Sequence, residues 1–368
     1  MTPARVLQVV LGLNPGGTER LVVELATRLH GQIPTAVCCL DAAGAWAPEV
    51  EAHGVHVRAL NRPPGFHPLI GRAVATAARA HGATVIHAHH YSPFVYSCCT
   101  RLAGLTIPIV FTEHGRLSDA GPSGKRRLAN AVLGRMAARA FGVSDDVRLH
   151  LVAEGFGAGQ VGVIYNGIDV GPVPDRDTRA QVRADLGVTD DVLVMATIAR
   201  LDPVKDLAVL LKAVHEASAD VPLLLLVIGD GPERAGLESE ASALGLGARV
   251  RFLGHRNDAR RWLAGCDVYV NTSVSEGVSL TILEGMAAAL PVVATAVGGT
   301  PEVVNDDCGM LIPARTPSSC AAALRRLGAD RGLGRTLGRR GRARVEARFT
   351  LDRMVHDYAA VYTELGAC

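Results

Sequence analysis

The chain alternates short apolar runs with helical patterns, and it does so in two separate series. The runs of the first series are Val6–Leu11, Val37–Leu40, Val55–Leu60, Val85–Ala88, Ile109–Thr112, Gly142–Ser144 and Gly162–Tyr165. The runs of the second series are Leu193–Ala199, Leu223–Gly229, Val250–Leu253, Val268–Val270 and Val292–Ala294. Short runs rich in Val, Ile and Leu are typical of strands buried on both faces. Their alternation with helices predicts two parallel, doubly wound α/β domains in tandem.

The boundary between the two series is a polar stretch that contains Pro172 and Pro174. We interpret residues 171–191 as an interdomain linker. The N-terminal domain then spans residues 1–170 and the C-terminal domain residues 192–348, which suits a chain of 368 residues. Residues 349–368 form a C-terminal helix, for which packing back on the N-terminal domain is one option.

Composition limits the classes of function. Hydrophobic residues make up 48% of the chain and the net charge is only +2, which argues against a nucleic-acid-binding protein. No secretory signal is visible, and the best apolar run, Val221–Gly229, is far shorter than the roughly 20 residues of a membrane span. None of the eight cysteines forms a C-x-x-C pair. We therefore expect a cytoplasmic protein.

A glycine pair lies between the first apolar run and the expected helix Glu19–Leu29. Gly16 and Gly17 let a ligand approach the backbone closely, and the free amides of a helix N-terminus suit phosphate. A tight turn without a ligand is the alternative. The pair is not part of a G-x-G-x-x-G pattern, so an NAD-dependent enzyme is disfavoured.

A cation pair, Arg200 and Lys205, follows the first run of the second series. Ligands of α/β sheets bind at the carboxyl ends of strands, so these two side chains can flank a diphosphate. A solvated surface pair is the alternative. Lysine is scarce in this chain: besides Lys205, the sequence contains only Lys125 and Lys212.

Two carboxylates eight positions apart form the most specific pattern. Glu276 lies in a loop before a helix and Glu284 lies inside that helix. Side chains lean towards a helix N-terminus, so both can reach hydroxyls at two ends of one extended ligand. The free amides of the loop and first helical turn form a second candidate phosphate site. They belong to Gly277, Val278, Ser279 and Leu280.

Further segments suit a cleft for a nucleotide-linked sugar. Gly229 and Gly231 form a turn at a strand end, and the strand that contains Phe252 and Leu253 can hold a base at its edge. A glycine-rich loop, Ala296–Glu302, follows a later strand.

Histidines end two strands of the first domain. His87 and His89 share one strand face, but metal binding needs a third ligand, so a buried, hydrogen-bonded histidine is the favoured interpretation. His114 is the better candidate for a ligand site, because Gly115 beside it allows a close approach.

Together these motifs resemble the retaining glycosyltransferases of family 4, which have the GT-B fold, and the resemblance covers nearly the whole chain. The segments that carry it are Gly16-Gly17, Glu113-His114-Gly115, Val143-Ser144, Tyr165–Asp169, Arg200 with Lys205, Gly229–Pro232, Glu276 with Glu284, and Gly298–Glu302. One departure is Gly285, where the family more often has alanine. We expect this glycine to soften the helix without removing the site.

The resemblance implies two Rossmann-like domains that face each other across a cleft, with a nucleotide-sugar donor held mainly by the second. It implies that Arg200 and Lys205 hold the diphosphate, assisted by the amides of Gly16 and Gly17. Glu276 would bind hydroxyls of the donor sugar, Glu284 the ribose, and His114 the region of the reacting carbon. The remaining donor-binding residues would be Asn166, Gly229, Gly231, Phe252, Leu253, Gly277, Val278, Ser279 and Leu280. It also implies that no metal and no separate cofactor are needed, and we favour a UDP-sugar over a GDP-sugar.

The expected activity is transfer of a hexose or N-acetylhexosamine to a glycan, a lipid-linked or a small-molecule acceptor, in cell-envelope or exopolysaccharide biosynthesis. A nucleotide-sugar epimerase of the same fold and an inactive subunit of a membrane-associated assembly are the alternatives. The segment Gly124–Arg139, around Lys125, reads as a basic amphipathic helix. It is either a solvated face or a surface that docks on the anionic inner face of the plasma membrane.

Overall fold

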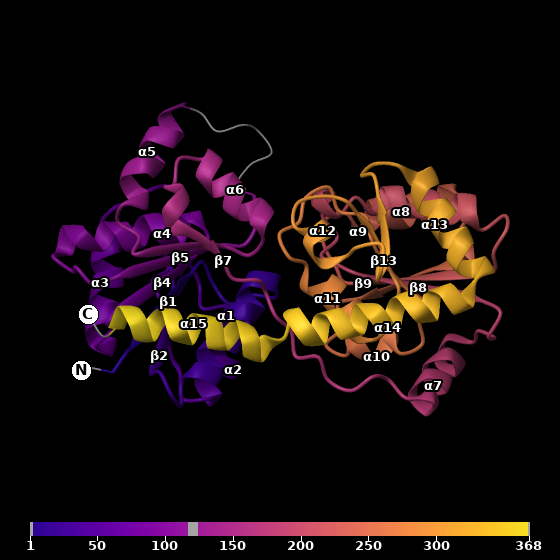
Figure 1. The fold of residues 1–368 in the computed structure, drawn as a ribbon, viewed down its shortest axis with the longest axis horizontal. Helices are drawn as coiled ribbons and strands as arrows, with labels where there is room; N and C mark the ends of the chain where they lie inside the picture. Colours follow the sequence, from indigo (N-terminus) through magenta and orange to yellow (C-terminus); the bar gives the residue numbers. More distant parts are fainter. Residues whose placement is uncertain (1–2, 117–123, 367–368) are drawn as a thin grey trace. The chain divides into compact units, whose positions relative to one another are not determined.

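The computed structural model describes residues 3–116 and 124–366, which form two compact units (Figure 1). Unit 1 comprises Met1–Asn166 together with Asp352–Cys368, and unit 2 comprises Gly167–Leu351. Each unit contains one sheet in which every pair of neighbouring strands is parallel. The predicted fold class, two doubly wound α/β domains, is confirmed.

Unit 1 has a seven-stranded sheet in the order β3-β2-β1-β4-β5-β6-β7. Its strands are β1 (Val6–Val10), β2 (Thr35–Cys39), β3 (His56–Ala59), β4 (Val85–His89), β5 (Ile109–Glu113), β6 (Arg139–Gly142) and β7 (Val161–Val163). Its helices are α1 (Gly17–Leu29), α2 (Ala47–Ala52), α3 (Ile70–His81), α4 (Tyr91–Cys98), α5 (Gly124–Gly134), α6 (Asp145–Ala153) and α15 (Leu351–Gly366), with 3-10 turns η1 (Cys99–Ala103) and η2 (Ala158–Gln160).

Unit 2 has a six-stranded sheet in the order β10-β9-β8-β11-β12-β13. Its strands are β8 (Leu193–Ile198), β9 (Leu223–Ile228), β10 (Val250–Gly254), β11 (Val268–Asn271), β12 (Val292–Thr295) and β13 (Gly309–Ile312). Its helices are α7 (Arg176–Leu186), α8 (Leu207–Ala217), α9 (Arg234–Ala243), α10 (Ala259–Leu263), α11 (Leu280–Ala287), α12 (Thr300–Val303), α13 (Pro317–Ala329) and α14 (Arg331–Arg348), with 3-10 turns η3 (Pro203–Lys205) and η4 (Gly247–Arg249).

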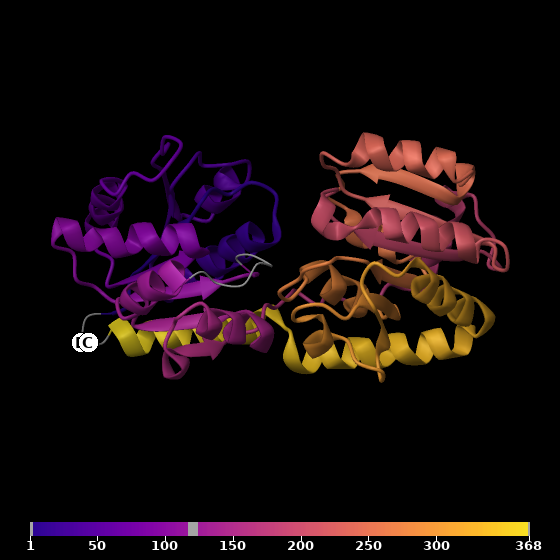
Figure 2. The same ribbon diagram turned by 90° about the horizontal axis from the view of Figure 1, so that it is seen from above.

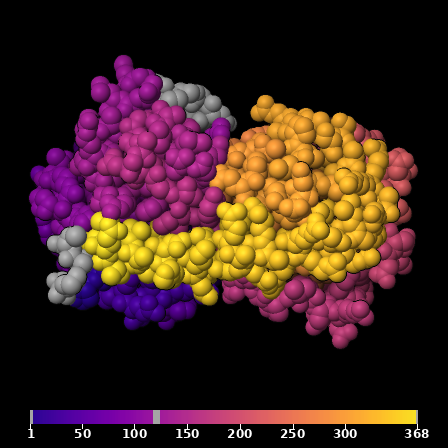
Figure 3. Space-filling view, in the orientation of Figure 1, coloured from indigo at the N-terminus to yellow at the C-terminus, as the bar shows by residue number. Residues whose placement is uncertain are grey.

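The two faces of the unit 1 sheet differ in chemistry. Leu7 and Phe111 belong to an apolar core on one face. Gln8, His87 and Thr112, at the alternate positions of their strands, lie on the other face and are buried. Helix α15 covers this polar face, on the side of the sheet where Figure 2 shows it in yellow. The outer side of α15 lies on the surface of unit 1 in Figure 3, whereas its tyrosines point inward.

The segment predicted to be a linker, residues 171–191, is instead part of unit 2 and contains helix α7. Asp175 caps the start of α7 by accepting a hydrogen bond from the Thr178 amide, and Gly187, at φ 63°, ends it. Only Val182, Arg183 and Leu186 of this helix are buried. A helix with so narrow a buried stripe is polar around most of its surface, which explains why its sequence resembles a linker.

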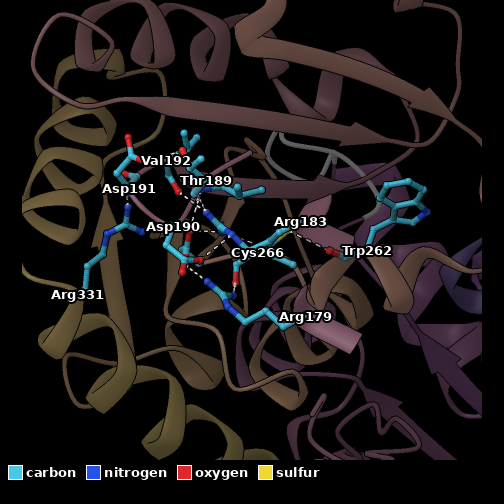
Figure 4. A network of polar contacts seen from close by, with 12 residues as sticks. Arg179, Arg183, Thr189, Asp190, Asp191, Val192, Trp262, Cys266 and Arg331 are labelled. Atoms are coloured by element: carbon cyan, nitrogen blue, oxygen red, sulfur yellow. Dashed lines mark hydrogen bonds and ion pairs between the residues drawn. The ribbon is translucent and has the colours of Figure 1, made fainter. Parts of the chain in front are cut away.

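A partly buried ion network connects α7 to the sheet of unit 2 (Figure 4). The carboxylate of Asp267 lies 2.6 Å from a guanidinium nitrogen of Arg179, 3.2 Å from one of Arg183 and 3.1 Å from one of Arg331. It also accepts a hydrogen bond from the Val194 amide at the start of β8. Only 5% of the Arg183 side chain is exposed, so Asp267 is the counter-charge that makes its burial tolerable.

Two further boundaries differ from the sequence prediction. The basic helix α5 ends at Gly134, which packs against the ring of Phe156, and Arg139 already begins strand β6. Ser144, expected to end a strand, is the N-cap of α6 and accepts a hydrogen bond from the Val147 amide. Strand β13 was not predicted. In the described part of the chain, no helix is long and apolar enough to cross a membrane.

We predict that Asp267→Ala lowers the free energy of unfolding of unit 2 by about 3–5 kcal/mol, because it leaves the buried Arg183 with only the fully exposed Asp190, 3.5 Å away, as a counter-charge. The measurement is denaturant unfolding followed by Trp262 fluorescence in a Trp46→Phe background. Asp185→Ala on the same helix is the control, because its pair with Arg261 is 45% and 32% exposed and its loss should cost under about 1 kcal/mol. Equal losses in the two variants would contradict the assignment.

Candidate active site

Each sheet reverses its strand order once, and the candidate residues gather at the two reversals. In unit 1 the chain winds outward from β1 to β3 and then returns to β4 beside β1; in unit 2 it returns to β11 beside β8. At such a reversal, the loops at the carboxyl ends of the two central strands separate and leave a crevice for a ligand. The loops that follow β1, β4, β8 and β11 carry most of the motifs found in the sequence.

In unit 2, Lys205 and Glu276 meet directly. The Lys205 Nζ atom lies 2.7 Å from Glu276 Oε1, and the two side chains are 23% and 9% exposed. Ser273 Oγ and Asn271 Nδ2 also donate to Glu276 Oε1, at 2.6 Å and 3.2 Å. All of these bonds converge on one oxygen, so the carboxylate is held in a fixed orientation.

The backbone of the Lys205 loop is tied to the Glu276 loop. The Val274 amide donates to the Val204 carbonyl at 2.8 Å, and Thr272 Oγ1 donates to the carbonyls of Lys205 and Asp206. The loops after the two central strands β8 and β11 are therefore bonded to each other through their backbones. Asn271, Thr272 and Ser273, which build it, were not singled out in the sequence.

Two glycines predicted to bind the donor pack against protein backbone. Gly229 has a φ of +134°, and a Cβ atom there would lie 1.9 Å from the Ala199 carbonyl oxygen. A Cβ on Gly231 would lie 2.4 Å from the Leu201 carbonyl oxygen. The structure thus gives both glycines a role in supporting the loop that carries Arg200.

The glycine-rich loop after β12 supports Glu276 in the same way. Gly298 has a φ of +52°, a Cβ atom there would lie 1.9 Å from the Glu276 carbonyl oxygen, and the Gly299 amide donates to that oxygen at 3.2 Å. The backbone at Glu276 is therefore fixed independently of its side chain.

Arg200 and Glu284 lie in the same unit but outside this cluster. The Arg200 side chain is 73% exposed, and its nearest recorded acidic group is Asp202 at 3.9 Å. The Glu284 carboxylate, on α11, lies 3.5 Å from the guanidinium of Arg260 on α10. The structure joins Lys205 to Glu276, whereas Arg200 and Glu284 have other neighbours.

Helix α11 begins directly after the Glu276 loop. Ser279 is its N-cap and Leu280 its first residue, and the first intrahelical bond recorded at this end runs from the Leu283 amide to the Ser279 carbonyl. The amides of Leu280, Thr281 and Ile282 therefore have no acceptor within the helix, as is usual for an N-terminal turn. The Val278 side chain is buried, so only its backbone is suited to a ligand.

The glycine at position 285 has a packing reason. A Cβ atom there would lie 2.5 Å from Cγ of Tyr269, a fully buried residue of β11 whose hydroxyl donates to the Ile198 carbonyl. The absence of a side chain at Gly285 on α11 leaves the space that the large Tyr269 ring on β11 fills. The sequence analysis predicted a softened helix at this glycine but did not predict this packing.

The remaining donor-binding candidates of unit 2 lie on an edge strand. Phe252 and Leu253 belong to β10, the outermost strand of the sheet, and both are partly buried. Phe252 packs against the hydrophobic core of the unit. Asn166, predicted to bind the donor as well, is buried and is the last residue of the first segment of unit 1.

In unit 1, the glycine pair is connected to the histidines by a relay of polar contacts. Gly16 is the N-cap and Gly17 the first residue of α1, and Thr18 Oγ1 lies 2.9 Å from His90 Nε2. His90 Nδ1 lies 2.8 Å from Glu113 Oε1, which also accepts the His114 amide at 3.0 Å.

His90 is the functional candidate that sequence reasoning missed in unit 1. It has a φ of +70° and a ψ of 162°, a region that residues with side chains rarely occupy. Burial acts to lower the pKa of His90, but the hydrogen bond to Glu113 and the charges of Glu113 and Glu19 together outweigh burial and raise this pKa. The doubled histidine at positions 89 and 90 was the available signal, because strand alternation sends the two rings to different sides.

His87, His89 and His114 form a buried cluster beside it. His89 Nδ1 lies 3.1 Å from His114 Nε2, and the rings of His87 and His89 are 4.0 Å apart. Burial lowers the pKa of all three well below 6.5, with neighbouring histidines adding to the effect. Within residues 3–116 and 124–366, no group of three or more His, Cys, Asp or Glu side chains is arranged to hold a metal ion.

We predict that unit 1 loses stability as the pH falls below about 6.5, the ordinary pKa of histidine. Below that pH the three cluster histidines are protonated in the unfolded chain and neutral in the fold, so unfolding takes up about three protons. The free energy of unfolding should then fall by roughly 4 kcal/mol per pH unit. His90 acts oppositely, because its raised pKa adds stability that is lost as the pH rises through that pKa.

The measurement is the unfolding of unit 1, followed by Trp46 fluorescence in a Trp262→Phe background between pH 7.5 and 5.5. Calorimetry in two buffers of different ionisation enthalpy counts the protons taken up. Uptake of less than one proton near pH 5.5 would show that the cluster is not neutral in the fold.

The comparisons with known proteins agree on one family. Residues 15–171 match the family model described as Glycosyltransferase Family 4, and residues 192–330 match the one described as Glycosyl transferases group 1. The chain is 30% identical to a D-inositol 3-phosphate glycosyltransferase of a Nocardioides species, over 85% of this chain and 78% of that protein. It is 27% identical to the N-acetyl-alpha-D-glucosaminyl L-malate synthase of Bacillus anthracis, over 82% and 80%.

Among solved structures, Alr3699/HepE of Anabaena, crystallised with UDP and glucose, superposes with a TM-score of 0.87 at 24% identity, over 98% of this chain and all of that one. This similarity confirms the GT-B fold. Two family matches that fall one in each unit, and a relative aligned along most of both chains, lead to one conclusion. The chain belongs to glycosyltransferase family 4, the group 1 glycosyltransferases.

Proposed function

We propose that this glycosyltransferase moves a hexosyl or N-acetylhexosaminyl group from a UDP-sugar to an acceptor, with retention of anomeric configuration and without a metal ion. The observation that carries the proposal is the Lys205–Glu276 pair at the strand reversal of unit 2. In the proposed reaction, Lys205 is the cation for the leaving diphosphate and Glu276 beside it is the acceptor for sugar hydroxyls. The UDP and UDP-glucose complexes of Alr3699/HepE support the choice of donor.

The reaction separates charge, and this determines which side chains matter. As the sugar–phosphate bond breaks, negative charge develops on the diphosphate, and fixed donors that face it lower the barrier. Lys205 and Arg200 are the cations proposed for this role, with the amides of the first turn of α11, from Leu280 to Ile282, as additional donors. Glu276 keeps Oε2 for a hydroxyl of the sugar, since the recorded bonds to its side chain end at Oε1.

The proton balance needs no dedicated base. A new bond forms between the acceptor oxygen and the anomeric carbon on the face that the diphosphate leaves. The proton of the acceptor hydroxyl passes to the departing phosphate oxygen. Gly16, Gly17 and His114 keep the roles implied by the family resemblance, towards the diphosphate and the reacting sugar. Glu284 keeps its role towards the ribose, which requires it to exchange Arg260 for the ribose hydroxyls.

We predict that the full chain slowly hydrolyses a UDP-sugar without an acceptor, and that Lys205→Ala lowers the rate at least 100-fold because it removes a donor to the leaving group. Glu276→Gln should do the same through the sugar. UDP release is measured for UDP-glucose, UDP-N-acetylglucosamine, GDP-mannose and ADP-glucose. Lys212→Ala is the matched control, because Lys212 is half exposed on α8 and pairs only loosely with Glu240, at 3.5 Å.

Three results would contradict the proposal: near-normal hydrolysis by both site variants, loss of activity in EDTA, or faster turnover of a GDP- or ADP-sugar. Nuclear magnetic resonance of the products separates the alternatives. An isomerised nucleotide sugar indicates an epimerase, and an unchanged donor indicates an inactive subunit. Donor binding is checked separately, because saturation at 100 times Kd should stabilise the fold by about 2.7 kcal/mol.

We also propose that unit 1 docks on an anionic membrane surface through α5 and α6. Leu128 and Val132 on α5 are 71% and 55% exposed, and Leu149 on α6 is 53% exposed. Lys125 precedes Leu128 by three residues and shares its face of α5. Arg127 is exposed on the same helix, and Arg135, directly after its end, is exposed as well. Apolar side chains among cations are typical of helices that lie in a lipid interface. A lipid-linked acceptor in cell-envelope synthesis would fit such a location.

The test is flotation with phosphatidylcholine vesicles with and without phosphatidylglycerol. We predict binding only to the anionic vesicles, and at least a tenfold loss of binding in Leu128→Glu, which places a charge of the wrong sign in the apolar face. The matched control is Leu102→Glu, an apolar residue of unit 1 that is 64% exposed on η1. Absence of lipid-dependent binding, or equal losses in both variants, would exclude this surface.

A further inference from the structure

A chain of buried polar contacts runs from the C-terminal helix to His114. The hydroxyl of Tyr362 on α15 accepts a hydrogen bond from Gln8 Nε2, at 3.2 Å. Gln8 Oε1 lies 2.8 Å from His89 Nε2, and His89 Nδ1 lies 3.1 Å from His114 Nε2. Tyr362, Gln8 and His89 are fully buried, so water does not compete for these bonds.

The direction of this chain follows from the orientation of the Gln8 amide. Its Nε2 group faces Tyr362, so its Oε1 faces His89 and must accept a proton there. His89 therefore carries its hydrogen on Nε2. Burial lowers the pKa of His89 and of His114, so each ring is neutral and has a single N–H group. His89 Nδ1 is then an acceptor, and His114 donates to it from Nε2.

One nitrogen atom at the end of this series of hydrogen bonds has no partner. His114 Nδ1 is buried and has no hydrogen-bond partner among the described residues. In this arrangement it carries a lone pair and no hydrogen, so the partner it lacks is a donor. A hydroxyl group of a sugar is such a donor.

Tyr362 has a second contact that favours this direction. Its hydroxyl lies 2.5 Å from His87 Nδ1, and His87 Nε2 lies 2.8 Å from Thr112 Oγ1. With the Gln8 amide donating to it, the Tyr362 hydroxyl has its own hydrogen free to donate to His87. If every hydrogen bond from Tyr362 to His114 had the opposite donor and acceptor, His114 Nδ1 would be an N–H group without a partner. Buried N–H groups without a partner are rarer than buried acceptors without one.

We propose that Tyr362 is a positioning residue of the C-terminal helix: through Gln8 and His89 it holds His114 in the Nε2–H tautomer, whose Nδ1 accepts a hydrogen bond from a hydroxyl of the donor sugar. The proposal rests on the proposed function for the identity of the sugar, but its tautomeric part does not. It gives α15 a role in the chemistry, although α15 carries none of the sequence motifs.

Removal of the Tyr362 hydroxyl has a specific consequence. In Tyr362→Phe, the end of the Gln8 amide that bonded to the Tyr362 hydroxyl faces an apolar ring instead. Turning the amide over moves the unpaired N–H group from the fully buried Gln8 to His114, which is only partly buried, so we expect the amide to turn over. Gln8 then donates to His89 Nε2, His89 donates from Nδ1, and His114 becomes the Nδ1–H tautomer.

The experiment is nuclear magnetic resonance of the full chain labelled with ¹⁵N-histidine, with the His114 signals assigned by a His114→Gln sample. We expect the wild type to show a protonated Nε2 and an unprotonated Nδ1 in His114, and Tyr362→Phe to exchange the two. Donor hydrolysis by Tyr362→Phe should fall about tenfold, while the Kd for UDP, which has no sugar, stays within twofold.

Tyr358→Phe is the matched control. Tyr358 lies one turn earlier on α15 and is also buried. It bonds to Thr112 at 3.0 Å, and hydrogen bonds connect it to Tyr362 through Thr112 and His87, not through Gln8. It should lose comparable stability and keep the wild-type tautomer of His114. An Nδ1–H tautomer in the wild type, an unchanged tautomer in Tyr362→Phe, or an exchanged tautomer with unchanged hydrolysis would each overturn the proposal. If the wild type hydrolyses no sugar nucleotide, the proposed function fails, and the ¹⁵N spectra still decide the tautomer.

Discussion

The reversal of strand order in each parallel sheet is the constraint on which the rest of the structure depends. A parallel sheet delivers every loop after a strand to the same edge, and only at a reversal do two neighbouring loops diverge. The reversals lie between β1 and β4 and between β8 and β11. They explain why Thr18 and His90, or Lys205 and Glu276, come from segments far apart in the sequence and still contact each other.

The loops at these reversals are held by backbone more than by side chains. Gly229 and Gly298 each have a positive φ, and each lies against a carbonyl of a loop that carries a candidate residue. A side chain at either position would collide with that carbonyl, so only glycine allows the two loops to pack this closely. Sequence reasoning found both glycines and predicted that Gly229 touches the ligand. The structure adds a close approach of Gly229 to the Ala199 carbonyl, which spacing along a chain does not contain, and the contact with the ligand stays a prediction.

The polar face of the unit 1 sheet depends on helix α15. Buried polar groups are costly unless each has a partner, and Tyr358 and Tyr362 supply partners for Thr112, His87 and Gln8. A network of this kind transmits hydrogen-bond direction as well as stability, because each neutral histidine that donates from one nitrogen accepts at the other. The polar face therefore fixes which atoms donate and which accept, whereas the contacts of the apolar face around Phe111 have no such direction.

The sequence by itself determined the two α/β domains, the strand ends that carry candidate residues and the family, because periodicity and motif spacing are local properties of the chain. It did not reveal the assignment of α7 to unit 2, since that depends on a single buried stripe and on the counter-charge of Asp267. It also did not reveal the pairing of Lys205 with Glu276 in preference to Arg200, or the link from Tyr362 to His114. Those contacts join residues separated by 25 to 354 positions, and only the packed sheets bring them within bonding distance.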